Sequence, residues 1–238
     1  MCFYYALSQQ AQRLKNRYQI KFDFEFEPVF YTSGFDYPKM PVITNVQPDR
    51  IQELTWGLIP YWVKTPTEAM DLRTHTLNAR IETASTKPSF RHAIKQKRCL
   101  VPAGGFYEWR ECQGKKYPYY IYLKSQAIFS FAGIWDEWID RETGEVLKTF
   151  SILTTQANPL LEKIHNTKKR MPVILPENRE RDWLRNDLNS EEILALAKPF
   201  DENLMEAHTV SKLITSRTEN RNAPAIQDVN NYPGLSSL

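Results

Sequence analysis

Residues 99–111 read CLVPAGGFYEWRE, and this stretch says most about the fold. Its apolar first half predicts a buried strand, the glycine pair at 104–105 predicts a turn, and the aromatic second half predicts another strand. In that second strand Glu108 lies between Tyr107 and Trp109. Large apolar neighbours disfavour the charged form of a carboxylate, which makes Glu108 a candidate general acid or base. On an edge strand the same carboxylate would simply face water.

Strand patterns recur on both sides of this stretch. The predicted strands cover residues 22–34, 41–47, 53–62, 77–83, 117–124, 127–135 and 148–155. The predicted helices are short and cover residues 8–19, with Ser8 as a possible cap, and then 87–97, 157–165, 177–186 and 190–200. Many strands with interspersed helices favour the α+β class. With no repeat and no clear linker, residues 1–238 are expected to form one domain, irregular from about 218 to 238.

The composition is that of an ordinary globular protein, with 42% hydrophobic and 25% charged residues in 238. No apolar run reaches the length of about 18 residues that a membrane span needs, and no secretory signal is present. The three cysteines, Cys2, Cys99 and Cys112, lack CxxC spacing, which disfavours a disulfide scaffold and a zinc site. We therefore expect no membrane, no metal and no cofactor, and a reducing cytoplasm.

Basic residues form three clusters, at 91–98, 110–116 and 168–170, in a chain that also has 6 Trp and 12 Tyr. Cations interleaved with aromatic rings suit single-stranded nucleic acid, whose bases stack and whose phosphates need positive charge. The alternative is solvated charge on a well-packed aromatic protein. A net charge of +3 favours that alternative when composition is considered alone.

Two further segments carry candidate polar site residues. If residues 77–83 form a strand, then Asn78, Arg80 and Glu82 share one face, where an amide beside a guanidinium suits a phosphate or a sugar. A polar solvent face is the alternative. His165 ends the helix predicted at 157–165, and a single histidine there is more often a helix-end residue than a catalyst.

Cys2 has a chemistry that depends on its position. Once Met1 is removed, Cys2 carries a thiol and a free α-amine, with ordinary pKa values of about 8.5 and about 7.7–8.0. Such a 1,2-aminothiol reacts with an aldehyde by forming an imine, to which the thiol then adds to close a thiazolidine ring. The alternative is an ordinary residue in a frayed terminus. A lipoprotein cysteine is excluded because only one residue precedes it, and myristoylation is excluded because residue 2 is not glycine.

Taken together, these motifs resemble those of the SOS-response-associated peptidase (SRAP) family of abasic-site processing proteins. The shared motifs, in order, are Met1-Cys2, WGLIPYW (56–62), NARIET (78–83), KPSFR (87–91), RCLVPAGGFYEW (98–109), ILTTQAN (152–158), IH (164–165), RMPVIL (170–175) and VSK (210–212). They span nearly the whole chain. The run RCLVPAGGFYEW and the N-terminal cysteine are specific to the family.

The resemblance implies a single α+β domain with a β-barrel-like core of mostly antiparallel strands and peripheral short helices. It implies a monomer that binds single-stranded DNA containing abasic sites, in the cytoplasm and near the nucleoid of a bacterium. The implied activity is a covalent thiazolidine crosslink between Cys2 and the ring-opened sugar, which shields the lesion during the DNA damage response. The alternatives are a thiol autopeptidase that uses Cys2 with His165, and a non-covalent binder of modified bases.

Motif by motif, the resemblance also implies roles for individual residues. Cys2 is the nucleophile, and Asn78 positions the amine or the sugar. Glu108 moves protons during imine formation and ring closure, while His165 assists opening of the deoxyribose ring. Two further residues bind DNA: Arg80 contacts phosphate and Trp109 offers a surface to a flanking base.

The chain departs from the family pattern at two places. Family members continue Met-Cys with Gly-Arg, whose arginine contacts phosphate, whereas Phe3 and Tyr4 follow here. Residues 166–169 separate the histidine from the arginine of RMP, where many members have one residue. Arg170 is the phosphate ligand that the pattern implies, and Lys168 or Lys169 is the substitute that the insertion suggests.

Overall fold

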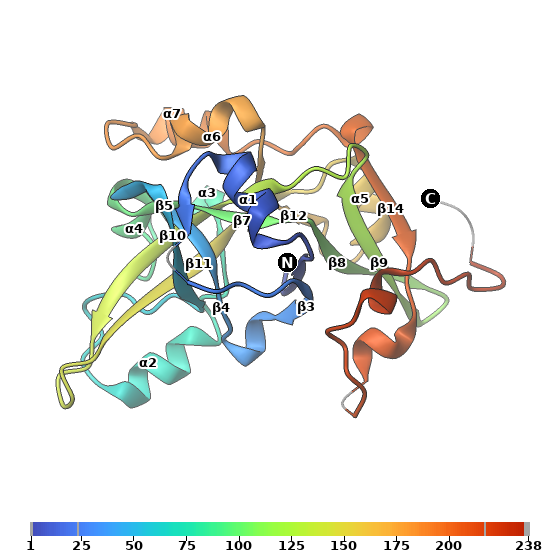
Figure 1. Ribbon diagram of the computed structural model, residues 1–238, viewed down its shortest axis with the longest axis horizontal. Coiled ribbons are helices and arrows are strands. Elements are labelled where there is room, and N and C mark those ends of the chain that lie inside the picture. Colours follow the sequence, from blue (N-terminus) through green and yellow to red (C-terminus); the bar gives the residue numbers. More distant parts are fainter. Residues whose placement is uncertain (1, 23, 217, 236–238) are drawn as a thin grey trace.

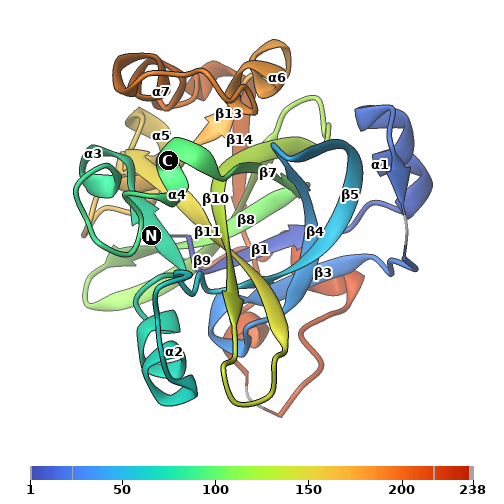
Figure 2. The ribbon, with the colours of Figure 1, turned by 90° about the vertical axis from the view of Figure 1, so that its left-hand side faces the viewer.

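Two β-sheets form the centre of the protein, a computed structural model that describes residues 2–22, 24–216 and 218–235. The first sheet is antiparallel, in the order β14 (Met205–Thr209), β9 (Lys115–Leu123), β8 (Gly105–Cys112), β1 (Tyr4–Leu7) and β3 (Val29–Ser33). The second has the order β12 (Arg170–Pro172), β11 (Val146–Gln156), β10 (Phe129–Ile139), β7 (Arg98–Ala103), β4 (Lys39–Thr44), β5 (Gln47–Trp56) and β2 (Lys21–Phe22). Figures 1 and 2 show the two sheets from perpendicular directions.

The second sheet closes on itself. Strand β5 pairs antiparallel with β4 and also parallel with β11, so β11, β10, β7, β4 and β5 form a five-stranded barrel. Two short strands are attached to it: β6 (Asn78–Arg80) runs parallel to β11, and β13 (Ile174–Leu175) pairs with β10. The prediction of an α+β domain with a barrel-like core of mostly antiparallel strands is confirmed.

Short helices lie around the sheets, as Figure 2 shows most clearly for α1, α2, α6 and α7. The α-helices are α1 (Ala11–Tyr18), α2 (Pro66–Arg73), α3 (Ile81–Ala84), α4 (Ala93–Gln96), α5 (Pro159–Ile164), α6 (Glu180–Trp183) and α7 (Ser190–Leu196). Side chains fix some of their starts: Thr65 caps α2, Asn158 caps α5, and Asn189 forms a capping box with Glu192 on α7. Nothing in residues 2–22, 24–216 and 218–235 forms a helix both long enough and apolar enough to span a membrane.

The stretch at residues 99–111 joins the two sheets. It forms β7 and β8 as predicted, but the two strands do not pair with each other. The glycines between them instead carry the chain from the barrel into the first sheet, where the Gly104 amide donates to the Ala6 carbonyl at 2.8 Å. A Cβ atom at Gly105 would overlap the Tyr120 ring, so this crossing needs a residue without a side chain.

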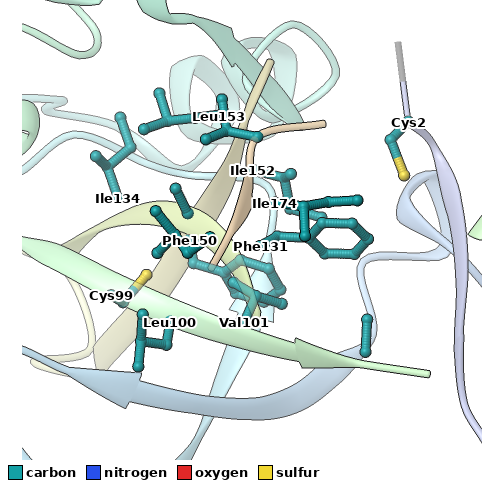
Figure 3. Close-up of a cluster of buried hydrophobic side chains, with 14 of the residues drawn as sticks. Cys2, Cys99, Leu100, Val101, Phe131, Ile134, Phe150, Ile152, Leu153 and Ile174 are labelled. Atoms are coloured by element: carbon teal, nitrogen blue, oxygen red, sulfur yellow. The ribbon is translucent and has the colours of Figure 1, made fainter. Parts of the chain in front are cut away.

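The barrel interior is apolar. Figure 3 shows Val101, Phe131 and Phe150 among the side chains that fill it, with Cys2 to one side of the group. Trp56, predicted within a strand that runs into an aromatic turn, is fully buried and donates its Nε1–H to the Leu77 carbonyl at 2.8 Å. Cys2 therefore sits against a packed core.

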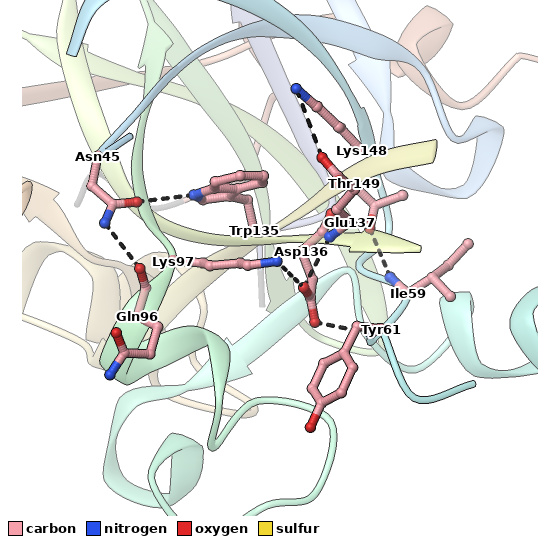
Figure 4. A network of polar contacts seen from close by, with 10 residues as sticks. All are labelled: Asn45, Ile59, Tyr61, Gln96, Lys97, Trp135, Asp136, Glu137, Lys148 and Thr149. Atoms are coloured by element: carbon pink, nitrogen blue, oxygen red, sulfur yellow. Dashed lines mark hydrogen bonds and ion pairs between the residues drawn. The ribbon is translucent and has the colours of Figure 1, made fainter. Parts of the chain in front are cut away.

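A polar network anchors the segment that follows β5, as Figure 4 shows. The Asp136 carboxylate is buried, accepts from the Tyr61 amide at 3.0 Å and pairs with the Lys97 ammonium at 2.8 Å. The Thr149 hydroxyl accepts from the Ile59 amide at 2.8 Å. A buried carboxylate is tolerated only when its charge is compensated, and here an ammonium and a backbone amide compensate it.

Several predicted elements are shorter than expected. Helix α1 begins at Ala11 with Gln10 at its N-cap and no side-chain capping bond, so the assignment of Ser8 as cap is wrong. Of the helix predicted at 87–97, only α4 forms. Strand β6 ends at Arg80, where α3 begins, so Glu82 does not share a strand face with Asn78.

Two predictions about strands also need correction. The strand predicted at 22–34 is split into the end of β2 and the whole of β3. Its aromatic residues Phe22, Phe24 and Phe26 gather instead, with ring centroids 4.7 and 6.0 Å apart. Strand β14 was not predicted at all. The alternation of side chains in MEAHT is too weak to indicate a strand without its partner β9.

The C-terminal segment, expected to be irregular from about 218 to 238, is packed against the rest of the protein where it is described. Within residues 218–235 it contains one 3₁₀ turn, Pro224–Gln227, whose Ile226 is buried. Val229 bridges to Val210, and the Asn230 amide donates to the Thr209 carbonyl at 2.8 Å. Residues 236–238 lie outside the described residues.

Candidate active site

Strand β8 carries Glu108 into the protein interior. It lies between β9 and β1 in the middle of its sheet, so Glu108 is not on an edge. Side chains alternate along a strand, and Phe106, two residues earlier, faces the core, with its ring 5.9 Å from that of Phe131. Glu108 therefore shares the inner face of β8, while Tyr107 and Trp109 point to the other face. Glu108 is therefore buried and does not face water, and the cause of its burial is the strand face and not the two flanking aromatic residues.

Burial changes the titration of Glu108. The residue is 5% exposed, and desolvation raises the pKa of its carboxyl to about 7, although the nearby positive charge of Lys168 acts in the opposite direction. Both protonation states are therefore populated near neutral pH. A carboxyl in this condition can donate a proton in one step and accept one in the next.

His165 lies next to Glu108 at the end of α5. Its Nδ1 lies 2.8 Å from the Arg170 carbonyl oxygen, and since a carbonyl only accepts, Nδ1 carries the proton. Its Nε2 lies 3.9 Å from the Glu108 Oε2. Burial is the largest influence on the imidazole and lowers its pKa to about 4, helped by the positive charges of Lys168 and Arg170. The neutral ring therefore directs an unprotonated nitrogen toward the Glu108 carboxyl.

Cys2 is fully buried, so the alternative of a frayed terminus is wrong for this residue. Its thiol donates to the Tyr4 carbonyl, with the sulfur and oxygen 3.7 Å apart. Burial and the negative charge of Glu108 both raise the pKa of the thiol, so it is protonated at neutral pH and needs a base to react. Met1, whose removal the chemistry requires, lies outside the described residues.

A pocket of about 330 Å³ opens over this group. Its lining residues are Phe3, Tyr4, Glu108, Trp109, Glu111, Lys116, His165, Thr167, Lys168 and Thr215. The pocket thus brings together four of the predicted site residues: Glu108, Trp109, His165 and Lys168. A larger pocket of about 610 Å³ is lined by parts of β13 and α7, and none of the described site residues lines it.

The inserted residues 166–169 lie on strand β8. The Asn166 side chain makes two hydrogen bonds to the backbone of Glu111, accepting from its amide at 3.1 Å and donating to its carbonyl at 2.8 Å. These two hydrogen bonds hold the loop at the pocket, and Lys168 remains exposed at the pocket rim. Sequence reasoning named Lys168 but missed Asn166, because nothing in the sequence indicates that residues 111 and 166 meet.

Arg170 has a different environment from that of an exposed phosphate ligand. Its guanidinium is buried and makes a two-pronged ion pair with Glu82, at 2.6 and 2.9 Å, and it also donates to the Thr154 carbonyl at 2.7 Å. Desolvation is the largest influence and acts to raise the pKa of Glu82, but the hydrogen bonds and charge of Arg170, a backbone hydrogen bond and the charge of Arg80 together outweigh it, so the net shift is downward. Arg80 and Lys169 are exposed and do not line the pocket.

Asn78 is buried on β6, beside Ile152 of β11. Within the described part of the chain, neither its amide nitrogen nor its amide oxygen has a hydrogen-bond partner. An unsatisfied buried amide costs about 1–3 kcal/mol per group, so such a side chain is expected to meet a partner during function. Asn78 does not line the pocket itself.

The assembled groups suit proton transfer around a thiol. The Glu108 carboxyl and the neutral His165 imidazole line the pocket. The protonated Cys2 thiol does not line it and is fully buried, but it lies near enough to Glu108 for that charge to act on its pKa. Within residues 2–22, 24–216 and 218–235, no cluster of three or more His, Cys, Asp or Glu residues could hold a metal ion. The fold and the site therefore define a class: a barrel protein with a buried cysteine near its N-terminus and a neighbouring carboxyl and imidazole that line a pocket.

Comparison with known proteins identifies the family. The family profile described as SOS response associated peptidase (SRAP) matches residues 1–217. Abasic site processing protein YoqW of Bacillus subtilis is 40% identical over 183 residues, which is 76% of this chain and 78% of that protein. Abasic site processing protein HMCES of Pongo abelii is 34% identical over 199 residues, 71% of this chain and 54% of its own greater length. The chain belongs to the SRAP family.

Solved structures share this fold. The crystal structure of a protein from Bacteroides thetaiotaomicron superposes with a TM-score of 0.92 at 41% identity, covering 97% of this chain and all of the other. A second, from Bordetella bronchiseptica, has a TM-score of 0.76 at 25% identity and covers 88% of this chain and all of the other.

Proposed function

We propose that this protein captures abasic sites in single-stranded DNA by forming a covalent thiazolidine with Cys2. The observation that carries the proposal is the position of Cys2, the second residue in the sequence, which is buried within electrostatic reach of Glu108, a carboxyl that lines an open pocket together with His165. The names of the YoqW and HMCES relatives support the substrate. An abasic sugar in its open form is an aldehyde, the electrophile that a 1,2-aminothiol traps.

The reaction balances without a cofactor. Removal of Met1 frees the Cys2 amine, which attacks the sugar C1 and forms a carbinolamine. Loss of water gives an imine. The thiolate then adds to the imine carbon and the nitrogen takes up a proton, so that aldehyde and aminothiol become thiazolidine and water. The high pKa of the buried thiol makes a neighbouring base necessary, and Glu108 is the carboxylate whose charge reaches it.

We assign ring opening to His165. With Nδ1–H held by the Arg170 carbonyl, Nε2 is the atom that can accept the proton of the sugar C1 hydroxyl. The low pKa of the ring keeps that nitrogen unprotonated and uncharged at neutral pH, so its lone pair is available to accept a proton. Arg170 then acts through its backbone, because its side chain is committed to Glu82. Its role becomes positioning of His165 in place of the phosphate contact implied by the family pattern.

DNA binding follows from the charges around the pocket. Lys168 at the rim and the exposed Arg80 and Lys169 are our proposed phosphate contacts, and Trp109 is the proposed surface for a base. Asn78 is proposed to hold the amine or the sugar, since its buried amide lacks a partner in the described residues. Binding of a single strand is favoured because a duplex would have to open before C1 could reach Cys2.

One gel experiment tests this function against its two alternatives. Protein with Met1 removed is mixed with a single-stranded oligonucleotide that carries an abasic site, heated in SDS and separated under denaturing conditions. Covalent capture predicts a slow-migrating band that survives heating and is missing when the oligonucleotide has no abasic site. A thiol peptidase predicts cleavage of peptide substrates and no such band, and a non-covalent binder predicts neither. Absence of the band would contradict the proposal.

The phosphate contacts predict a salt-dependent affinity. Each contact to a single strand contributes about 0.7 to the slope of log affinity against log salt concentration, so Lys168→Ala and Arg80→Ala should each lower the slope by about that amount. Trp109→Ala should weaken binding with little change of slope. Fluorescence anisotropy with an unreactive tetrahydrofuran lesion measures both. Lys198→Ala, exposed beside the larger pocket, is the matched control. Unchanged slopes, or equal affinity for duplex, would contradict these contacts.

A further inference from the structure

Aromatic rings form a column on the outer face of the first sheet. The Tyr4 ring meets Trp109 edge-on, with centroids 5.0 Å apart, and stacks on Tyr31 at 5.6 Å. Behind Tyr31, the Arg221 guanidinium lies 4.7 Å from the ring centre and donates to the Tyr31 hydroxyl at 3.1 Å. The column therefore runs from Trp109 through Tyr4 and Tyr31 to Arg221.

Hydrogen bonds between nearby side chains and the backbone of β3 hold the rear of this column in place. The Asn222 side chain accepts from the Phe30 amide at 2.7 Å, which ties the C-terminal segment to the edge strand β3. The Tyr107 hydroxyl donates to the Phe30 carbonyl at 2.6 Å and holds the next ring in place. Rings held in this way lose little conformational entropy when a ligand packs on them.

The front of the column opens on the reaction pocket. Tyr4 and Trp109 line it together with Phe3 and His165. Phe35, 48% exposed, extends the aromatic surface, with its ring 4.9 Å from Phe3. An aromatic wall of half-buried rings, extended by the exposed Phe35 and next to a cationic rim, suits a flat π-system attached to an anionic backbone.

We propose that Tyr4, supported by Trp109, stacks the unpaired base of the nucleotide next to the lesion and makes the protein sensitive to that base. This inference rests on the proposed function. The abasic sugar occupies the pocket without a base of its own. The base of the adjacent nucleotide is therefore the ring that stacks on the aromatic wall. A purine offers more stacking area than a pyrimidine and is preferred. A base paired in a duplex cannot reach the wall, which adds to the preference for single strands.

The test is a thermodynamic cycle in which the Tyr4 ring is removed from the protein and the flanking base is removed from the DNA, separately and together. Each oligonucleotide carries one unreactive tetrahydrofuran lesion, flanked by a purine, a pyrimidine or a second tetrahydrofuran on its 5′ or 3′ side. For the wild-type protein, removing the base on one side should weaken binding between about fivefold and about 150-fold, the range for stacking of one base. Tyr4→Leu keeps the apolar bulk but removes the ring. It should bind the purine-flanked strand as weakly as wild type binds the strand lacking that base.

Controls separate stacking from folding and from charge. Tyr4→Phe should keep the wild-type response to the flanking base. Tyr122→Leu removes a half-buried ring from β9 of the same sheet, outside the pocket, and should also keep it. The salt slope of Tyr4→Leu should equal that of wild type, because no phosphate contact is lost.

The outcomes are distinguishable from those of the proposed function. If wild type forms the heat-stable adduct but binds equally with and without either flanking base, this inference is overturned and the proposed function stands. The same holds if Tyr4→Leu stays fully sensitive to the flanking base. If no adduct forms and no abasic strand binds, both are overturned.

Discussion

Replacing Cys2 by alanine is expected to abolish the heat-stable adduct with abasic single-stranded DNA. Thiazolidine closure needs a sulfur and an amine on adjacent carbons, and among the cysteines of this chain only Cys2 can have both, once Met1 is removed. Cys2→Ser should also lose the stable adduct, although its amine can still form an imine that borohydride traps. The measurement is the fraction of labelled DNA retained in the slow band after heating.

The remaining cysteines provide the control for this experiment. Cys112 is partly exposed on the same strand as Glu108, and Cys99 is buried in the barrel. Cys112→Ala should give a normal yield, because its amine is tied up in a peptide bond. A heat-stable adduct of normal yield from Cys2→Ala would remove Cys2 from the mechanism, whatever the control shows.

Glu108→Gln is expected to slow conversion of the imine to the stable adduct by about 10²–10⁴-fold, the usual contribution of a positioned acid or base. The amide cannot take the thiol proton or pass it to the imine nitrogen. More of the complex should therefore remain trappable by borohydride. Reaction at the wild-type rate would leave Glu108 as a structural carboxylate.

The same substitution should change the pH dependence of stability. The folded-state pKa of Glu108, about 7, exceeds its usual 4.5, so the native protein binds more protons between these pH values. The resulting contribution to stability is complete below pH 4.5 and is lost as the pH rises through 7. Relative to wild type, Glu108→Gln should gain about 2.5 kcal/mol of unfolding free energy between pH 5 and pH 8. Denaturant unfolding at the two pH values measures this difference. If wild type and Glu108→Gln show the same pH dependence of stability, the pKa of Glu108 is not raised in the folded protein.

His165→Ala provides the contrast for Glu108→Gln. Loss of the imidazole should slow appearance of the imine, because ring opening precedes it. A substrate whose aldehyde is already open should therefore restore the rate of His165→Ala but not that of Glu108→Gln. Equal rescue of both variants would show that the two residues do not divide the steps in this way.

The residue pattern was sufficient to predict the elements that carry the chemistry. Residues 99–111 indicated two strands and a buried carboxylate because apolar runs and a glycine pair are local signals. The pattern could not show that β7 and β8 enter different sheets, since pairing depends on partners far away in the chain. For the same reason it explained the burial of Glu108 by its sequence neighbours, whereas the inner face of a central strand is the cause.

Contacts between distant segments account for most of what the sequence did not reveal. Arg170 belongs to a motif that suggests a phosphate ligand, but its partner Glu82 lies 88 positions away along the chain. Asn166 holds the inserted loop through Glu111, and neither residue has a pattern of its own. In the sequence, Tyr4 is notable only because it stands where the family pattern has an arginine. Its place in the aromatic column depends on the pairing of β1 with β3 and β8, which the sequence does not show.

Mass spectrometry of the crosslinked N-terminal peptide tests the central claim most directly. The adduct with abasic single-stranded DNA is formed without borohydride, digested with nuclease and protease, and fragmented. The account predicts a peptide that begins at Cys2, lacks Met1 and carries the sugar remnant on its first residue with loss of one water. A remnant on Lys168 or another lysine, or an adduct that still contains Met1, would contradict it.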